Sequence, residues 1–251
     1  MPQITRQNTT PIQLQTGHTS AASDARLDAV CQWLNETLPQ TIEHSILSVK
    51  HFGYGGGQDK ASRKAARQSE FAAGRFCAQQ ALSRWNEYGP VGKSKDRSPN
   101  WPAGFSGSIS HSKNWVWAAA SKSDQIRSIG VDTEPIVDAT TRSQTWEQAA
   151  TRTELQTIQA LGLDPNTEFT VLFSAKEAFY KCWYPVAKEF FYFKDAIVES
   201  CQPGKLTIRP TNDNPISDLQ PSHLTVQYFV DAEDVFTVAW LTRPTEKAQK
   251  V

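Results

Sequence analysis

The chain has 251 residues with 26 basic and 26 acidic side chains, so its formal net charge is zero. This balance does not support a general role in binding nucleic acids or other polyanions, and any basic site must be local. The length suffices for one large domain or two small ones, and no stretch is long and apolar enough to predict a membrane span.

The first 23 residues are polar and weakly patterned. They lack the apolar core of a signal peptide, and we expect them to be partly ordered at best. The four cysteines are scattered without paired spacing: Cys31, Cys77, Cys182 and Cys201. This distribution is typical of reduced thiols rather than of disulfides or a zinc site, so we expect a cytoplasmic protein.

The next elements alternate between helix and strand patterns. Residues 25–38 have helical apolar spacing that stops at Pro39, and residues 42–52 contain an alternating run typical of a strand. Residues 53–57, Gly-Tyr-Gly-Gly-Gly, predict a permissive turn. A glycine cluster can also cradle phosphate, but this one lacks the Gly-Lys-Ser/Thr ending of a P-loop.

Residues 59–85 predict one long helix with a basic end. Four basic side chains share one face because they follow i, i+3, i+4, i+7 spacing: Lys60, Arg63, Lys64 and Arg67. Such a stripe is usually a solvated face, but an apolar patch farther along the helix sets the basic end apart. Residues 88–107 are rich in Pro and Gly and predict a loop, and residues 115–121 predict a buried strand.

Residues 126–135 predict a strand that ends at Pro135, which cannot donate to a ladder. Asp132 and Glu134 are two residues apart and therefore project from the same side, with Thr133 facing away. Two carboxylates on one face repel each other unless a proton or a cation lies between them, and Mg²⁺ suits hard oxygen ligands. The alternative is a solvated strand end with two surface acids.

The rest of the chain predicts helices followed by strands. Residues 137–144 are a predicted polar linker, and residues 146–161 a helix that ends at Gly162. A further helix, capped by Thr167, runs to Tyr184, where Pro185 stops it. Four strands follow, of which the last two form a hairpin around residues 231–234: residues 197–198, 206–209, 224–230 and 235–241.

Two charged residues of the second helix, Glu177 and Lys181, are four apart and share a face. They form either a routine surface ion pair, or a third metal carboxylate with a lysine that clamps phosphate. Lys176 lies off that face, so it serves either to neutralise the site or to support the fold.

Two of these segments together resemble a known family. Gly-Val-Asp-x-Glu at residues 130–134, followed by Ser-Ala-Lys-Glu-Ala-x-x-Lys at residues 174–181, is similar to the 4'-phosphopantetheinyl transferases, and most to the branch with the enterobactin-synthase and mycobacterial enzymes. The resemblance runs from about Arg63 to about Asp195. Phe173 stands where the family often has Trp, as in the enterobactin branch.

The resemblance also implies contacts to coenzyme A. The segment Arg-x-x-Glu-Phe-x-x-x-Arg assigns Arg67 and Arg75 to its phosphates, with Lys64 and Arg63 as neighbours on the shared helix face. Arg-x-Pro-x-Trp-Pro makes Arg97 a phosphate or adenine contact, or else an exposed loop arginine.

Two further contacts follow from matching segments. Gly-Ser-Ile-Ser-His implies that Ser110 and His111 contact the diphosphate. Phe191 lines the pantetheine channel or belongs to the core.

The fold that the resemblance implies is α+β, with two similar halves related by pseudo-twofold symmetry, residues 1–125 and 126–251, and coenzyme A between them. The implied activity is that of a holo-[carrier protein] synthase, which moves 4'-phosphopantetheine from coenzyme A to a serine of an acyl or peptidyl carrier protein and leaves adenosine 3',5'-bisphosphate. Asp132, Glu134 and Glu177 would hold Mg²⁺, and Lys181 would bind phosphate. Glu177 would accept the serine proton, directly or through a metal-bound water, and His111 would donate to a phosphate oxygen as charge develops.

The chain is expected to act as a monomer. Fatty-acid, polyketide, nonribosomal-peptide, polyunsaturated-lipid and siderophore pathways all stay open. A Mg²⁺-dependent nucleotide phosphohydrolase and a non-catalytic coenzyme A sensor are the alternative functions.

Overall fold

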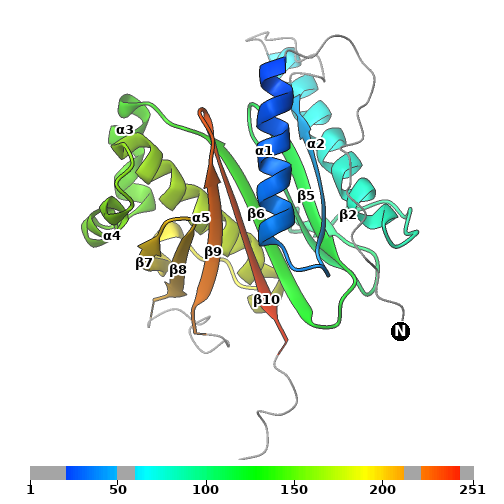
Figure 1. The fold of residues 1–251 in the computed structure, drawn as a ribbon. Coiled ribbons are helices and arrows are strands. Elements are labelled where there is room, and N and C mark those ends of the chain that lie inside the picture. Colours follow the sequence, from blue (N-terminus) through cyan, green and yellow to red (C-terminus); the bar gives the residue numbers. More distant parts are fainter. Residues whose placement is uncertain (1–20, 50–59, 212–221, 244–251) are drawn as a thin grey trace, which may run out of the picture.

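The computed structural model describes residues 21–49, 60–211 and 222–243. They form a mixed α+β fold with two large antiparallel sheets, a small two-stranded one, and helices packed against the large sheets (Figure 1). The predicted α+β class is therefore confirmed. The glycine-rich turn at residues 53–57 lies outside the described residues.

The first sheet has the order β1-β5-β4, formed by β1 (Glu43–Ser48), β5 (Trp115–Ser121) and β4 (Ser106–His111). Helices α1 (Ala21–Thr37) and α2 (Lys60–Ser83) cover its two faces. Because side chains alternate along a strand, Trp117 and Ala119 of β5 join the core under α1, while Val116 and Ala118 join the core under α2. This double cover explains why all of β5 is buried, as predicted.

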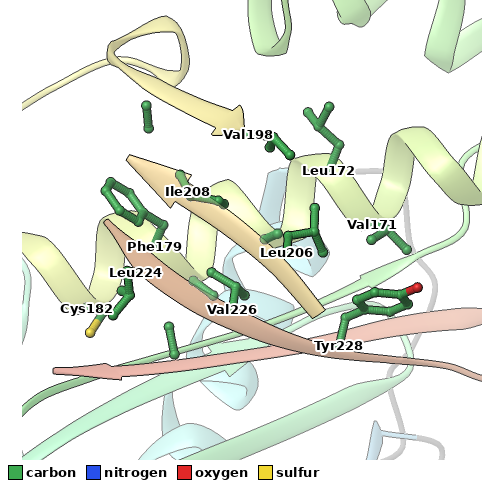
Figure 2. Packing of buried hydrophobic residues seen from close by; sticks show 14 of the residues in the cluster. Val171, Leu172, Phe179, Cys182, Val198, Leu206, Ile208, Leu224, Val226 and Tyr228 are labelled. Atoms are coloured by element: carbon green, nitrogen blue, oxygen red, sulfur yellow. The ribbon is translucent and has the colours of Figure 1, made fainter. Parts of the chain in front are cut away.

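The second sheet has the order β6-β10-β9-β8-β7. Its strands are β6 (Ile126–Pro135), β7 (Ala196–Gln202), β8 (Lys205–Pro210), β9 (Leu224–Val230) and β10 (Asp234–Thr242). The long helix α5 (Pro165–Ala187) packs across one face, and Figure 2 shows its side chains among those of β7, β8 and β9. The predicted strands and the terminal hairpin are confirmed.

Helix α1 also packs on the second sheet, so one core joins both sheets. The cluster under α1 contains Ile129 and Val131 of β6 and Phe236 and Val238 of β10. The division of the chain at residue 126, where β6 begins, and the twofold relation of the halves stay predictions. None of the helices in the described ranges is long and apolar enough to cross a membrane.

The linker predicted at residues 137–144 was wrong, because α3 (Ala139–Ala149) begins inside it. Asp138 caps this helix by accepting a hydrogen bond from the Thr141 amide. Ala149 alone is buried among the residues of α3. A mostly solvated helix of Thr, Ser and Gln lacks the apolar periodicity that would have indicated it.

The single helix predicted at residues 146–161 was also wrong. Helix α3 ends at Ala149, and a separate helix, α4 (Arg152–Ile158), begins with a reciprocal capping box between Thr151 and Glu154. A short 3₁₀ turn, η2 (Gln159–Leu161), then ends at Gly162 with φ +66°, as the predicted glycine cap requires.

Helix α5 begins and ends differently from the prediction. Asp164, not Thr167, caps it, and Pro165 takes the first helical position, where a missing N–H is harmless. Pro185 lies inside the helix, which continues to Ala187 and is capped by Lys188 with φ +57°. Val186 and Ala187 pack against the core between α5 and the second sheet, and this packing stabilises the helix beyond the proline.

Two short strands, β2 (Gly92–Lys93) and β3 (Pro99–Asn100), form a small hairpin within the predicted loop. A 3₁₀ turn, η3 (Phe193–Asp195), leads into β7.

Candidate active site

Asp132 lies at the centre of the site because of strand alternation. In β6, Ile129 and Val131 face the core under α1, so Gly130 and Asp132 face α5. Asp132 is only 2% exposed. A buried carboxylate needs hydrogen bonds and opposite charge to be stable, and Asp132 receives both from two other elements.

Three side chains donate to the Asp132 carboxylate. Ser174 of α5 donates to Oδ2 at 2.7 Å, and Ser110 of β4 donates to Oδ1 at 2.9 Å. The ammonium of Lys181 donates to the same Oδ1 at 2.7 Å and to Ser110 Oγ at 3.1 Å. The structure thus brings β4, β6 and α5 together at one carboxylate, and three of the predicted site residues meet there.

Glu134 and Glu177 belong to the same electrostatic group. Burial raises the pKa of Glu134 to about 8, with a further contribution from the negative charge of Asp132, while Lys181 acts in the opposite direction. Burial also raises the pKa of Glu177, where Lys181 lowers it and Asp132 raises it. Three carboxylates therefore interact electrostatically with one ammonium in a partly buried region.

The pKa of Lys181 responds to the same charges. Burial alone would lower it, but Asp132, Glu177 and Glu134 together raise it. The lysine is therefore cationic and supplies one of the positive charges that the carboxylates require.

The donor set fits a divalent cation in chemistry and in charge. Asp132, Glu134 and Glu177 offer hard oxygen ligands, which Mg²⁺ prefers, and Lys181 alone leaves them with excess negative charge. In the side-chain positions of the described ranges, no three His, Cys, Asp or Glu groups form a ready-made metal cluster. Lys181 and the two serines hold the Asp132 oxygens instead, so a metal would have to draw the carboxylates together.

Lys176 serves the fold and not this site. Its side chain is 1% exposed, and its ammonium lies 2.6 Å from Glu154 Oε1. It also donates to the carbonyl oxygens of Ala149 and Phe193 at 2.9 and 3.0 Å. Of the two roles left open for Lys176, the structure supports the structural one.

The predicted coenzyme A residues lie on several elements around this centre. Lys64 and Arg67 are exposed on α2. Arg75 of the same helix is half-buried, with its guanidinium 4.5 Å from the Phe71 ring and its Nε without a hydrogen-bond partner among the described residues. Its neighbour Gly74 packs tightly on Ile109 of β4, which precedes Ser110.

Arg97 lies in the turn between β2 and β3 with φ +72° and an exposed side chain. The neighbouring Asp96 accepts a hydrogen bond of 2.8 Å from the Tyr184 hydroxyl of α5, so the turn is tied to the helix that carries Lys181. His111 is exposed at the end of β4, directly after Ser110. The side chain of Arg63 lies outside the described residues.

Phe191 is 5% exposed and packs edge-on against Phe179 and Tyr180. This packing accounts for a core role, and the channel-lining role stays a prediction.

Sequence reasoning missed two partners of the acidic group. Ser174 precedes Glu177 by three positions and Lys181 by seven, so helix periodicity could have placed it on their face. Asp234, whose charge contributes to the raised pKa of Glu134, gives no local signal, because it reaches the group only through the pairing of β10 with β6.

Comparisons with known proteins agree with these motifs. A model of the 4'-phosphopantetheinyl transferase N-terminal domain matches residues 58–121, and a model of the 4'-phosphopantetheinyl transferase superfamily matches residues 128–239. The two matches lie on either side of the turn between β5 and β6.

Curated relatives match at about one residue in three. The 4'-phosphopantetheinyl transferase PptT of Mycobacterium tuberculosis is 32% identical over 140 residues, which cover 53% of this chain and 58% of the relative. Npt of Nocardia iowensis is 34% identical over 138 residues, covering 52% and 58%. Enterobactin synthase component D of Salmonella typhi is 33% identical over 141 residues, covering 56% of each. The chain thus spans less than two thirds of the length of these relatives.

Proposed function

This chain belongs to the 4'-phosphopantetheinyl transferase superfamily, and from that premise we propose that it transfers the 4'-phosphopantetheine group of coenzyme A to a serine hydroxyl of an acyl or peptidyl carrier protein. Adenosine 3',5'-bisphosphate is the leaving product. The observation that carries the proposal is the meeting of Asp132 with Lys181, Ser110 and Ser174, from three separate elements, beside Glu134 and Glu177.

The acidic side chains have two roles in this proposal. Asp132, Glu134 and Glu177 hold Mg²⁺, which when bound offsets the negative charge that builds on the diphosphate. Glu177 also accepts the proton of the attacking serine. Its raised pKa suits this role, because a base works best with a pKa near the working pH.

Lys181 binds the phosphate that is attacked. An ammonium group has three N–H donors, and Lys181 directs donors to Ser110 and Asp132. These bonds fix the Lys181 side chain in one conformation, so little conformational entropy is lost when it binds the phosphate.

Positioning of coenzyme A falls to Arg67, Arg75, Arg97 and Lys64 through its phosphates, and to Ser110 and His111 through the diphosphate. Arginine suits phosphate because its planar fork binds two oxygens at once. The position of Arg75 supports this role, since its neighbour Gly74 packs on Ile109 of the strand that carries Ser110 and His111. Phe191 contacts the pantetheine arm only if the core opens there.

The carrier protein belongs to a specialised pathway, such as nonribosomal-peptide, polyketide or siderophore synthesis. We also propose a cytoplasmic monomer. All four cysteines are free thiols, which supports a reducing compartment.

The direct test is mass spectrometry of an apo carrier protein incubated with the chain, Mg²⁺ and coenzyme A. We expect a mass increase of about 340 Da, the phosphopantetheinyl group, on one serine. Removal of Mg²⁺ by a chelator should abolish the increase. No addition to any of a panel of peptidyl and acyl carriers would contradict the proposal.

A Glu177→Gln variant tests the assignment of the base. The amide keeps the shape of the side chain but cannot accept the proton, so transfer should fall by at least about a hundredfold, while calorimetry shows coenzyme A still bound. Full transfer by this variant would exclude Glu177 as the base.

The wild-type chain incubated with coenzyme A and Mg²⁺ but no carrier tests the alternative functions. Rapid release of the bisphosphate would favour a phosphohydrolase, and binding of coenzyme A without any turnover would favour a sensor.

A further inference from the structure

The β9–β10 hairpin carries a buried carboxylate that the proposed chemistry does not use. Asp234 is the first residue of β10 and follows a surface turn, yet it is 0% exposed. A buried carboxylate is strongly unfavourable unless hydrogen bonds and a cation compensate it. Its partners therefore show what the residue holds in place.

Those partners come from the first sheet and its helix. Both Asp234 oxygens accept hydrogen bonds of 3.0 Å from the Asn114 amide, and Oδ2 accepts one of 3.1 Å from the Trp115 indole. Arg26 of α1 donates to the same Oδ2. One carboxylate of the second sheet thus joins α1 and the turn between β4 and β5.

Arg26 also binds the other acidic residues of the hairpin turn. It binds both oxygens of Asp231 at 2.9 Å and Glu233 at 2.8 Å, and its guanidinium lies 5.5 Å from the Trp115 ring. Asp231 in turn accepts from the amides of Glu233 and Asp234 at 2.8 Å. The position of Asp234 is therefore determined from both sides.

The residues joined in this way lead directly to the active site. On one side, Asn114 belongs to the turn that follows His111, the last residue of β4. On the other side, Asp234 pairs with Pro135 and Val235 pairs with Glu134 in the β6–β10 ladder. The amide of Ile136, just after β6, also donates to the Glu233 carbonyl at 2.8 Å.

We propose that Asp234 is a positioning residue, which holds the His111 turn of the first sheet against the strand end that carries Glu134 in the second. The inference rests on the proposed function. The physical reason is that the phosphate contacts and the metal carboxylates come from different sheets, and a misplacement of about 1 Å between reacting groups can reduce a rate about a hundredfold. Asp234 and Arg26 act only through the residues they hold.

The test is a double-mutant cycle between Asn114→Ala and His111→Ala. Asn114→Ala removes the hydrogen bonds between the His111 turn and Asp234, while those from Arg26 and Trp115 to Asp234 remain. Alone, it should lower kcat/KM for coenzyme A about tenfold or more, because the freed turn no longer holds His111 in place and misplaced groups react more slowly. In the His111→Ala background it should have almost no effect, because the group that it positions is already absent. A merely structural role predicts that the two effects add.

The same cycle is measured on the dissociation constant of coenzyme A by calorimetry, which separates this inference from the function. Coupling in binding without transfer to any carrier would overturn the function and support the positioning role. Transfer by the wild type with additive effects in both measurements would overturn the positioning role.

Two further variants guard against misfolding. Arg26→Lys keeps the positive charge but loses the two-pronged contact with Asp231, and it should show the same coupling with His111→Ala; additive effects would count against the proposal. Arg209→Gln is the matched control, because it removes an ion pair with Glu199 in the β7–β8 hairpin and should change neither measurement. Thermal unfolding identifies any variant whose loss reflects instability.

Discussion

At the residue scale, two lysines of α5 pair with different carboxylates on different sides of the helix. Lys181 shares a helix face with Ser174 and Glu177 and reaches the carboxylate of Asp132. Lys176 is directed away from it to Glu154, which also accepts from the amides of Thr151 and Val198 at 2.8 and 2.9 Å. The Lys176–Glu154 pair therefore links α4, α5 and β7 and supports the helix on which Glu177 and Lys181 lie.

Lys176→Met is expected to lower the free energy of unfolding by about 3–5 kcal/mol, because it leaves the Glu154 charge buried without a counter-charge. Urea denaturation at neutral pH measures the change. Adding Glu154→Gln should recover part of the loss, since the charge is then removed as well. Lys93→Met, on the exposed β2 strand, is the control and should stay within about 0.5 kcal/mol. An equally small effect of Lys176→Met would show that the pair is not compensating a buried charge.

At the element scale, the contact of α5 with β6 sets the spacing between Asp132 and the helix residues. Gly130 allows it: a Cβ added there would lie 1.9 Å from the carbonyl oxygen of Ala178 and 2.5 Å from the amide nitrogen of Cys182. Both obstacles are backbone atoms of α5, which cannot move without moving the helix.

Gly130→Ala should therefore push α5 from the sheet. We expect the free energy of unfolding to fall by about 1–3 kcal/mol or more, as for overpacked cores, and transfer to fall about a hundredfold even well below the melting temperature. Denaturation and carrier mass spectrometry measure the two effects. Gly92→Ala is the control, since its Cβ would meet only ordinary contacts, the nearest at 3.6 Å. Wild-type transfer by Gly130→Ala would mean that this spacing does not matter.

At the scale of the whole molecule, three clusters of buried apolar side chains stabilise the described part of the chain. One lies under α2, one under α5, and one under α1, where it contacts strands of both sheets. Each cluster has a cysteine of its covering helix in it or beside it: Cys77 of α2, Cys182 of α5 and Cys31 of α1. These thiols can therefore report on each cluster separately.

We predict slow thiol labelling of the native chain at pH 8. Burial raises the pKa of Cys31 to about 11 and of Cys77 and Cys182 to about 12. Only the thiolate reacts, so labelling should accelerate as the pH rises towards these values, and Cys77 and Cys182 should stay protected until the chain opens. Peptide mapping after timed labelling measures each site, with the urea-unfolded chain as the control. Rapid labelling of Cys182 at pH 8 would contradict the packing of α5 on its sheet.

Local pattern was sufficient for most of the elements. A continuous apolar run predicted the buried strand β5, and the spacing of Asp132 and Glu134 predicted their common face. It failed where a helix has almost no apolar face, as in α3, and where packing carries α5 past Pro185. In both cases, capping and tertiary contacts outweighed the signal that residues make with their near neighbours.

The amino-acid sequence by itself determined the family, the fold class and the identity of the acidic and basic groups, because motifs and periodicity depend only on neighbouring residues. The tertiary structure alone decided which of them meet. Ser110, Asp132 and Lys181 are joined by hydrogen bonds across 22, 49 and 71 positions of the chain, and Arg26 reaches Asp234 across 208. Such contacts arise from the packing of sheets and helices, so no local pattern contains them.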